Sequence, residues 1–130
     1  MKHTKLIALV LTTALLAALL IACDSRSSGM KAAAGTYEGQ YIKMVGDTDD
    51  DRDTSKAFRL TLTADGKGTH ERDDLTLNVT WTLDGEKITV QETFIGAKLD
   101  YTGTLKDGEL HLFNGNPEDS WTAEYVYRKQ

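Results

Sequence analysis

The sequence predicts an all-β domain over residues 36–130, an antiparallel up-and-down meander of about eight strands that is closed or nearly closed into a barrel. Two observations support this fold class: apolar residues recur at every second position, and Asp-Gly or Asn-Gly pairs separate the apolar runs. Such pairs readily adopt the positive φ angles of a tight hairpin, so consecutive strands should be antiparallel neighbours. Closure into a barrel would remove the two edge strands that an open meander leaves exposed.

The apolar runs follow one another along the chain, with polar residues between their members. In order, the expected inward positions are Tyr37 and Tyr41, then Phe58, Leu60 and Leu62, then Leu75, Leu77, Val79, Trp81 and Leu83, then Ile88, Val90 and Phe94, then Leu99, Tyr101 and Leu105, then Leu110 and Leu112, and finally Trp121, Ala123, Tyr125 and Tyr127. The expected turns are Asp65-Gly66, Asp84-Gly85, Asp107-Gly108 and Asn114-Gly115.

These inward residues predict a filled interior. An eight-stranded barrel is just wide enough for side chains to fill it, so we expect no apolar cavity of about 300 Å³ or more. The alternative is an open lumen that holds a small apolar ligand. Such a lumen would be lined by Tyr37, Tyr41, Trp81, Glu92, Tyr101 and Trp121.

The opening segment GTYEGQY, the hairpins LTADGKGTH and WTLDGEKITV, and the closing YVYRK resemble the small lipocalin-like domains of secreted bacterial lipoproteins. The resemblance covers most of residues 35–129 and is one of pattern, not of a defined motif. It implies a lipocalin-like barrel. The chain departs from lipocalins at their opening Gly-x-Trp, where it has Gly35, Thr36 and Tyr37.

Residues 1–22 have the layout of a secretory signal peptide. Lys2 and Lys5 form a basic start, and residues 6–22 are apolar except for Thr12 and Thr13. As a helix this apolar run would rise about 25 Å, which is short of the roughly 30 Å hydrocarbon core that a permanent transmembrane helix must cross. A cleaved signal is therefore favoured over a transmembrane anchor.

Cys23 is the only cysteine of the chain and directly follows the apolar run. The segment LIAC, with Leu20, Ile21 and Ala22 before Cys23, resembles the lipobox of bacterial lipoproteins. In that family the cysteine receives a diacylglyceryl group and becomes the first residue of the mature chain. The resemblance implies a lipid anchor at the extracytoplasmic face of a bacterial cell membrane, because two acyl chains hold a protein stably. The alternative is a signal that is cut elsewhere, for instance near Ser28.

Residues 24–35 are rich in Ser, Ala and Gly and predict a flexible tether to a soluble body. Loss of Lys2 and Lys5 with the signal would change the formal net charge from −5 to about −7. So acidic a body is repelled by nucleic acid. We expect no nucleic-acid partner, a membrane contact through the lipid on Cys23, and a monomer.

The segment GDTDDDRDTSK is the one candidate for a metal site. Its alternate positions resemble the oxygen ligands of a calcium loop and hold Asp47, Asp49, Asp51 and Asp53. Arg52 stands where the turn glycine of an EF-hand belongs, and Phe58 stands where its bidentate glutamate belongs. We expect a solvated acidic loop, with a calcium site as the alternative.

Glu92 is in phase with Val90 and Phe94, so its carboxylate should point toward the core. Without a partner there it would cost several kcal/mol or shift its pKa. Either a β-bulge turns Glu92 outward and lets Ile95 pack in place of Phe94, or Glu92 pairs with a tyrosine or an arginine inside. We expect the bulge, or a position of Glu92 at the end of the barrel.

The remaining polar residues form no recognisable catalytic set. His70 and His111 each stand alone among polar neighbours, so we expect both at the surface. The sequence has no Gly-x-Ser-x-Gly motif and no phosphate-binding glycine loop. It therefore predicts a non-enzymatic binding or interaction module without a cofactor. The alternative function is a carrier of a small apolar ligand in a lipocalin-like lumen.

Overall fold

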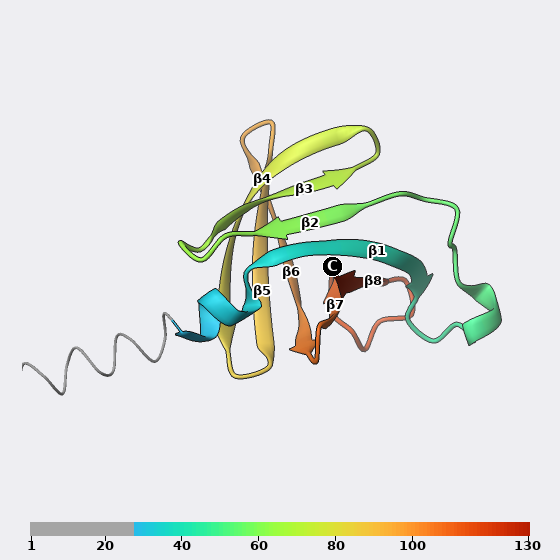
Figure 1. The fold of residues 1–130 in the computed structure, drawn as a ribbon. Helices are drawn as coiled ribbons and strands as arrows, with labels where there is room; N and C mark the ends of the chain where they lie inside the picture. Colours follow the sequence, from blue (N-terminus) through green and yellow to red (C-terminus); the bar gives the residue numbers. More distant parts are fainter. Residues whose placement is uncertain (1–27) are drawn as a thin grey trace, which may run out of the picture.

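The structure is a computed structural model that describes residues 28–130, and the predicted signal peptide and Cys23 lie outside the described residues. Its strands are β1 (Gly35–Met44), β2 (Arg59–Leu62), β3 (Lys67–Arg72), β4 (Leu75–Asp84), β5 (Lys87–Phe94), β6 (Ala97–Lys106), β7 (Glu109–Phe113) and β8 (Ala123–Lys129). Each strand is antiparallel to the next, and β8 pairs with β1, so the sheet closes into a barrel (Figure 1). The predicted all-β, up-and-down, eight-stranded barrel is therefore confirmed.

The connections between strands define two ends of the barrel. At one end, which we call the closed end, three tight turns hold Gly66, Gly85 and Gly108 at φ angles of 84°, 62° and 77°, as the predicted Asp-Gly turns require. At the other end, which we call the open end, lie the connections 45–58, 73–74, 95–96 and 114–122. The pair Asn114-Gly115 was predicted to form a tight turn. It instead begins the connection 114–122, which is second in length to the connection 45–58.

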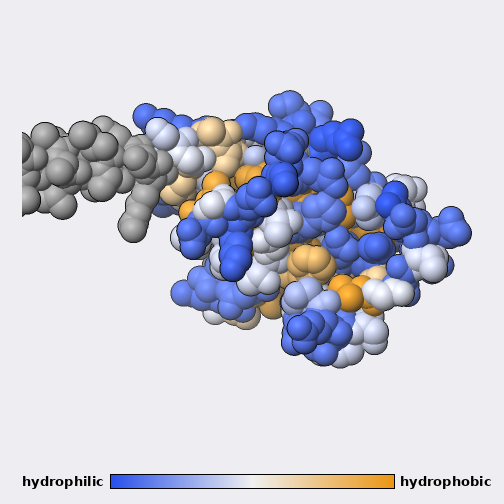
Figure 2. All heavy atoms as spheres, turned by 90° about the horizontal axis from the view of Figure 1, so that it is seen from below, coloured by the Kyte–Doolittle hydropathy of each residue, from blue (hydrophilic) through white to orange (hydrophobic). Residues whose placement is uncertain are grey.

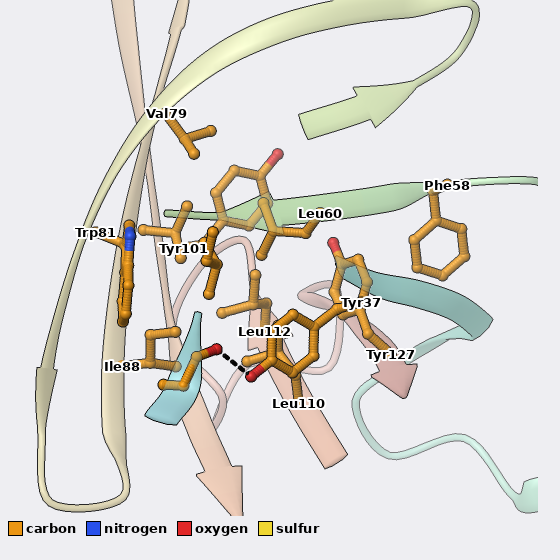
Figure 3. Close-up of a cluster of buried hydrophobic side chains, with 13 residues drawn as sticks. Tyr37, Phe58, Leu60, Val79, Trp81, Ile88, Tyr101, Leu110, Leu112 and Tyr127 are labelled. Atoms are coloured by element: carbon orange, nitrogen blue, oxygen red, sulfur yellow. Dashed lines mark hydrogen bonds between the residues drawn. The ribbon is translucent and has the colours of Figure 1, made fainter. Parts of the chain in front are cut away.

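Residues 28–33 form a short helix at the closed end, where the sequence predicted a flexible tether. Met30 packs against the core, and Ala33 is buried. The Tyr37 hydroxyl donates a hydrogen bond to the Ala33 carbonyl at 2.5 Å, the dashed line of Figure 3. The prediction was wrong for this segment because small residues are typical of linkers, whereas alanine also has the highest helix propensity.

The interior of the barrel is filled by apolar side chains (Figure 3). Every strand except β3 contributes to this core. The indole N–H of Trp81 donates to the carbonyls of Thr63 and Lys67 at 2.9 and 3.1 Å, so even this large side chain has its polar atom satisfied. The buried members are Ala33, Tyr37, Phe58, Leu60, Leu62, Val79, Trp81, Ile88, Val90, Tyr101, Leu110, Leu112 and Tyr127.

The face of the barrel seen in Figure 2 is mostly hydrophilic, with hydrophobic residues in small areas between polar ones. The large apolar side chains that are exposed share one location, the open end of the barrel. They are Leu75, Phe94, Ile95, Leu99 and Trp121. Within residues 28–130 the structure contains no helix of the length and apolarity that crossing a membrane demands.

Candidate functional site

Strand β3 is the second arm of the predicted hairpin LTADGKGTH, but the sequence predicted no inward residues for it, and it brings polar side chains into the barrel. Its inward positions are Gly68, His70 and Arg72, so no apolar alternation marks it. Glycine is required at 68 because a Cβ atom there would collide with the carbonyl of Thr61 on β2. Alternation along β3 places His70 and Arg72 on the same inward side as Gly68, and both reach Glu92 on β5.

Glu92 of β5 is the centre of a buried polar cluster, and its side chain is 0% exposed. Its Oε1 accepts hydrogen bonds from His70 Nδ1 at 3.0 Å and Arg72 Nε at 3.2 Å. Its Oε2 accepts from Arg72 Nη2 at 3.0 Å and from the Tyr101 hydroxyl at 3.1 Å. These bonds replace the hydration that a buried carboxylate loses.

The expectation that Glu92 turns outward is wrong. Glu92 pairs in regular register with Val79 on β4 and Leu99 on β6, so no bulge changes its direction. Ile95 does not replace Phe94 in the core; it lies in the β5–β6 turn and is 88% exposed. The less favoured alternative, pairing with an arginine and a tyrosine inside, is the one the structure shows.

His70 extends the cluster to the opposite wall of the barrel and is 1% exposed, so its predicted surface position is wrong. The ionised carboxylate of Glu92 can only accept hydrogen bonds, which assigns a proton to His70 Nδ1. His70 Nε2 is hydrogen-bonded to the Tyr127 hydroxyl, 2.8 Å away. His111 does lie nearer the surface, between the carboxylates of Glu109 and Glu124, each 2.7 Å from a ring nitrogen.

The cluster sets the charge states of its members. Burial alone would raise the pKa of Glu92, but the hydrogen bonds and charges of His70 and Arg72 outweigh it and lower this pKa to about 2. The hydrogen bond with Glu92 raises the pKa of Arg72. Burial raises the pKa of Tyr101 and of Tyr127. At neutral pH the cluster therefore holds an ion pair surrounded by neutral phenols.

The hydrogen bonds of this cluster are made within the protein. Within residues 28–130, no buried side-chain nitrogen or oxygen lacks a partner. Arg72 also donates from Nη1 to Asp73 at 3.0 Å, so two carboxylates neutralise it. The cluster therefore forms a layer of fully hydrogen-bonded polar side chains between the apolar core and the open end.

Among the grooves that Arg72 lines at the open end, two are also bordered by Tyr125. The first has a volume of ≈ 260 Å³ and lies against Phe58 and Ile42. The second has a volume of ≈ 290 Å³ and lies between Leu99 of β6 and Asn114. Charged side chains border each groove, so both differ from the apolar lumen that a carrier would need.

The structure brings together four of the six predicted lumen residues and separates two. Tyr41 pairs with Val126 after a bulge between Gly39 and Tyr41, which turns its ring outward beneath the Arg52 guanidinium, 4.3 Å from the ring centroid. Trp121 is 70% exposed in the connection 114–122. The four inside the barrel are Tyr37, Trp81, Glu92 and Tyr101.

The acidic loop does not gather its carboxylates around one point. Its centre is a short 3₁₀ helix (Asp49–Asp51), and its carboxylates bond to different neighbours. Within residues 28–130, no group of three or more His, Cys, Asp or Glu side chains is arranged to hold a metal ion. The observed partners are Lys43 and Arg52 for Asp49, Thr48 for Asp51, and Ser55 for Asp53, while Asp47 precedes the 3₁₀ helix.

Crystal structures of the fluorescent protein UnaG are similar to this chain. One mutant of UnaG aligns with a TM-score of 0.45 and 16% identity, over 75% of this chain and 95% of that chain. A second mutant gives a TM-score of 0.42 and 18% identity over 74% and 94%, and the wild type gives 0.41 and 16% over 75% and 96%. No protein-family model matches the sequence, and neither does any curated protein.

Proposed function

We propose that this protein is a non-enzymatic binding module that a lipid on Cys23 holds at the extracytoplasmic face of a bacterial cell membrane. The filled interior is the observation that supports a binding surface over a carrier lumen. Apolar side chains fill the barrel from the closed end, and the Glu92 cluster lies between them and the open end. A partner must therefore be recognised on the outer surface or at the open end.

The alternative function, a carrier of a small apolar ligand, has less support from the same residues. Tyr37, Trp81 and Tyr101 do line the interior, but the polar atom of each is used within the protein. Displacing any of them would leave a buried polar group without a partner, which costs about 1–3 kcal/mol. A ligand would have to repay that cost in addition to opening the core.

The position of the N-terminal helix suggests how the module stands on the membrane. Residues 28–33 are fixed at the closed end, so only residues 24–27 remain between the helix and Cys23. Four residues reach at most about 14 Å when fully extended. The closed end then faces the lipid, and the open end, with its exposed apolar side chains, faces away from it.

The anchor is tested by fractionating cells that produce the variant Cys23→Ala. We expect this variant outside the membrane fraction, because residues 28–130 contain no membrane-crossing helix to replace the lipid. Ser27→Ala, a change near the same site that leaves the cysteine in place, should remain in the membrane fraction and be released by detergent. Retention of Cys23→Ala in the membrane would contradict the anchor.

The filled interior is tested by titrating the full chain with a fluorescent fatty acid. The variant Trp121→Phe leaves Trp81 as the only tryptophan, so energy transfer from Trp81 reports binding inside the barrel. We expect no saturable transfer. Uptake of one fatty acid per chain would show that the interior opens, and the carrier function would replace the one proposed.

A further inference from the structure

Strand β6 is longer than the strand beside it. It pairs with β5 from Ala97 to Thr104, but its pairing with β7 begins only at Thr102. Figure 1 shows the β5–β6 hairpin rising beyond β7 at the top of the view. Residues 97–101 of β6 therefore have a neighbouring strand on one side and an open edge on the other.

The backbone groups of Lys98 and Asp100 face this open edge. Leu105 donates its backbone N–H to Glu86 on the β5 side, so the odd-numbered residues of β6 bond toward β5. The even-numbered residues point their N–H and C=O groups the other way. For Thr102 and Thr104 the partner is β7, whereas in the part of the chain that the structure describes no hydrogen bond uses the backbone groups of Lys98 or Asp100.

Space for a partner exists beside this edge. The groove of ≈ 290 Å³ at the open end runs between residues 98–101 and the side chains of Asn114 and Tyr125. Leu99 faces the mouth of the barrel and is exposed. Free backbone groups in strand spacing and an exposed apolar side chain next to a groove are the features of an edge that accepts another strand.

The hairpin tip gives a second, independent observation. Ile95 has a φ of +48°, a conformation that is disfavoured for a β-branched residue, in a turn where Asn, Asp or Gly is preferred. Its side chain is exposed and lies outside the core, so packing within the barrel does not explain it. Strain of this kind is often kept where a side chain is needed for binding.

We propose that the open edge of β6 binds an extended segment of a partner protein as an added strand. This inference rests on the proposed binding function and names its class of partner. Donors and acceptors that repeat along a strand edge are matched by the backbone of another strand. Leu99 and the strained Ile95 then supply apolar contact on either side of the backbone pairing.

The charges on β6 specify the order of side chains in the partner. Lys98 and Asp100 alternate with Leu99 and therefore point to the outer face. An acidic residue opposite Lys98 and a basic residue opposite Asp100 would form favourable cross-strand pairs. In an antiparallel segment this order is basic, apolar, acidic from its N-terminus, with the apolar residue facing Leu99.

A second copy of this chain would also place Lys98 opposite Asp100, so its charges fit. Such pairing needs a two-fold axis that reverses the strand direction and with it the direction of each barrel. The closed ends of the two copies would then point in opposite directions. Two chains that are held in one membrane by short N-terminal segments cannot adopt that arrangement, which leaves a partner segment as the occupant.

The experiment selects displayed nine-residue random peptides on the full-length lipidated protein in detergent micelles. We expect enriched peptides with apolar residues at alternate positions and a basic, apolar, acidic order. Asp100→Pro removes the free N–H without removing a bond to β5, and it should weaken the selected peptide by at least about tenfold. Asp100→Ala keeps the N–H and should weaken it by no more than about fivefold.

Amide hydrogen exchange on the wild-type protein tests the same proposal if Asp100→Pro does not fold. The bound peptide should slow exchange at Lys98 and Asp100 by more than about tenfold and leave Gly46 in the distant acidic loop unchanged. Unchanged exchange at Lys98 and Asp100, equal binding to Asp100→Pro, or no enriched peptide would overturn the proposal. A dimer that Asp100→Pro abolishes would assign the edge to a second copy and overturn it too.

These outcomes are separate from those that test the proposed function. Membrane fractionation and the fatty-acid titration do not involve the β6 edge. Suppose that no peptide is selected, while Cys23→Ala leaves the membrane and no fatty acid is taken up. The proposal of strand binding at β6 would then be rejected, and the proposed function as a binding module would not be affected.

Discussion

Glu92 and Arg72 depend on each other because both lose water when the barrel closes over them. The pair is 3.0 Å apart, and the carboxylate is also held by His70 and Tyr101. A buried ion pair contributes modestly when complete, since desolvation opposes the attraction of the charges. Removing Glu92 is more costly, because the largely buried Arg72 then keeps only the exposed Asp73 as its charged partner.

We expect Glu92→Gln to lower the free energy of unfolding by about 3–5 kcal/mol at neutral pH, because Arg72 would keep its charge and lose its main partner. Urea denaturation followed by circular dichroism measures this change. Glu71→Gln is the matched control: Glu71 is on the exposed side of β3 and lies 3.7 Å from Arg59, so its loss should cost less than about 1 kcal/mol. Equal effects of the two changes would mean that Glu92 is solvated.

The low pKa of Glu92 predicts an acid-dependent loss of stability. The folded-state pKa is about 2 and the ordinary value is 4.5, so the unfolded chain binds the proton first. The stabilisation is fully present above pH 4.5 and is lost as the pH falls toward 2. Carbon NMR of the Glu92 carboxyl should show a midpoint well below 4.5, and a midpoint at or above 4.5 would contradict the described cluster.

The stability measurement uses the difference between the wild type and Glu92→Gln. Hydrogen bonds from Ser55 and Thr63 also lower the pKa values of Asp53 and Asp65. These two carboxyls titrate in both proteins and cancel in the difference. The wild type should therefore lose stability more steeply than Glu92→Gln between pH 4.5 and 2.

At the scale of elements, the sequence predicted the inward residues of every strand that carries apolar residues and none for β3, which does not. Alternation in the β4 segment is unambiguous because Val79 and Trp81 face inward between polar residues. In β3 the inward positions belong to a glycine, a histidine and an arginine. Side chains alternate between inside and outside as in β4, but no apolar residue marks the inward positions. Glu92 was itself the available clue, because an inward carboxylate requires a cationic partner on a facing strand.

Two other predictions failed for reasons that involve distant parts of the chain. Tyr41 kept the expected alternation in sequence, but a bulge after Gly39 shifts the register, and the Phe58 ring would lie 2.5 Å from a Cβ atom at position 39. Residues 28–33 have a linker-like composition, and they become helical where they can cover the closed end. The bulge has no local sequence pattern, and the helix propensity of the alanines does not show that residues 28–33 would cover the closed end.

The helix of residues 28–33 should depend on the hydrogen bond from Tyr37. We expect Tyr37→Phe to lower stability by about 1 kcal/mol, because the Ala33 carbonyl loses its donor at the buried closed end. The same change should speed trypsin cleavage after Lys31 by loosening the helix. Tyr41→Phe, on the outer face, should change neither quantity. Unchanged cleavage in Tyr37→Phe would show that packing alone holds the helix.

At the scale of the molecule, the two ends of the barrel have different structural roles. The closed end combines three tight turns with the covering helix, while the open end has the longer connections and the exposed apolar side chains. Between them the Glu92 cluster separates the packed apolar core from the mouth. This division lets one small domain keep a stable interior and still expose apolar surface where a partner can reach it.

The stability of the whole barrel should depend on Trp81 and not on Trp121. Trp81 fills the core and joins β4 to the β2–β3 hairpin, so Trp81→Ala should cost about 3–5 kcal/mol. Small domains have about 5–15 kcal/mol in total, so this variant should lie near its unfolding midpoint in mild urea. Trp121→Ala removes an exposed ring and should change stability by no more than about 0.5 kcal/mol. If Trp81→Ala instead unfolds at the same urea concentration as Trp121→Ala, the interior is not packed as described, and the argument against a ligand lumen loses its basis.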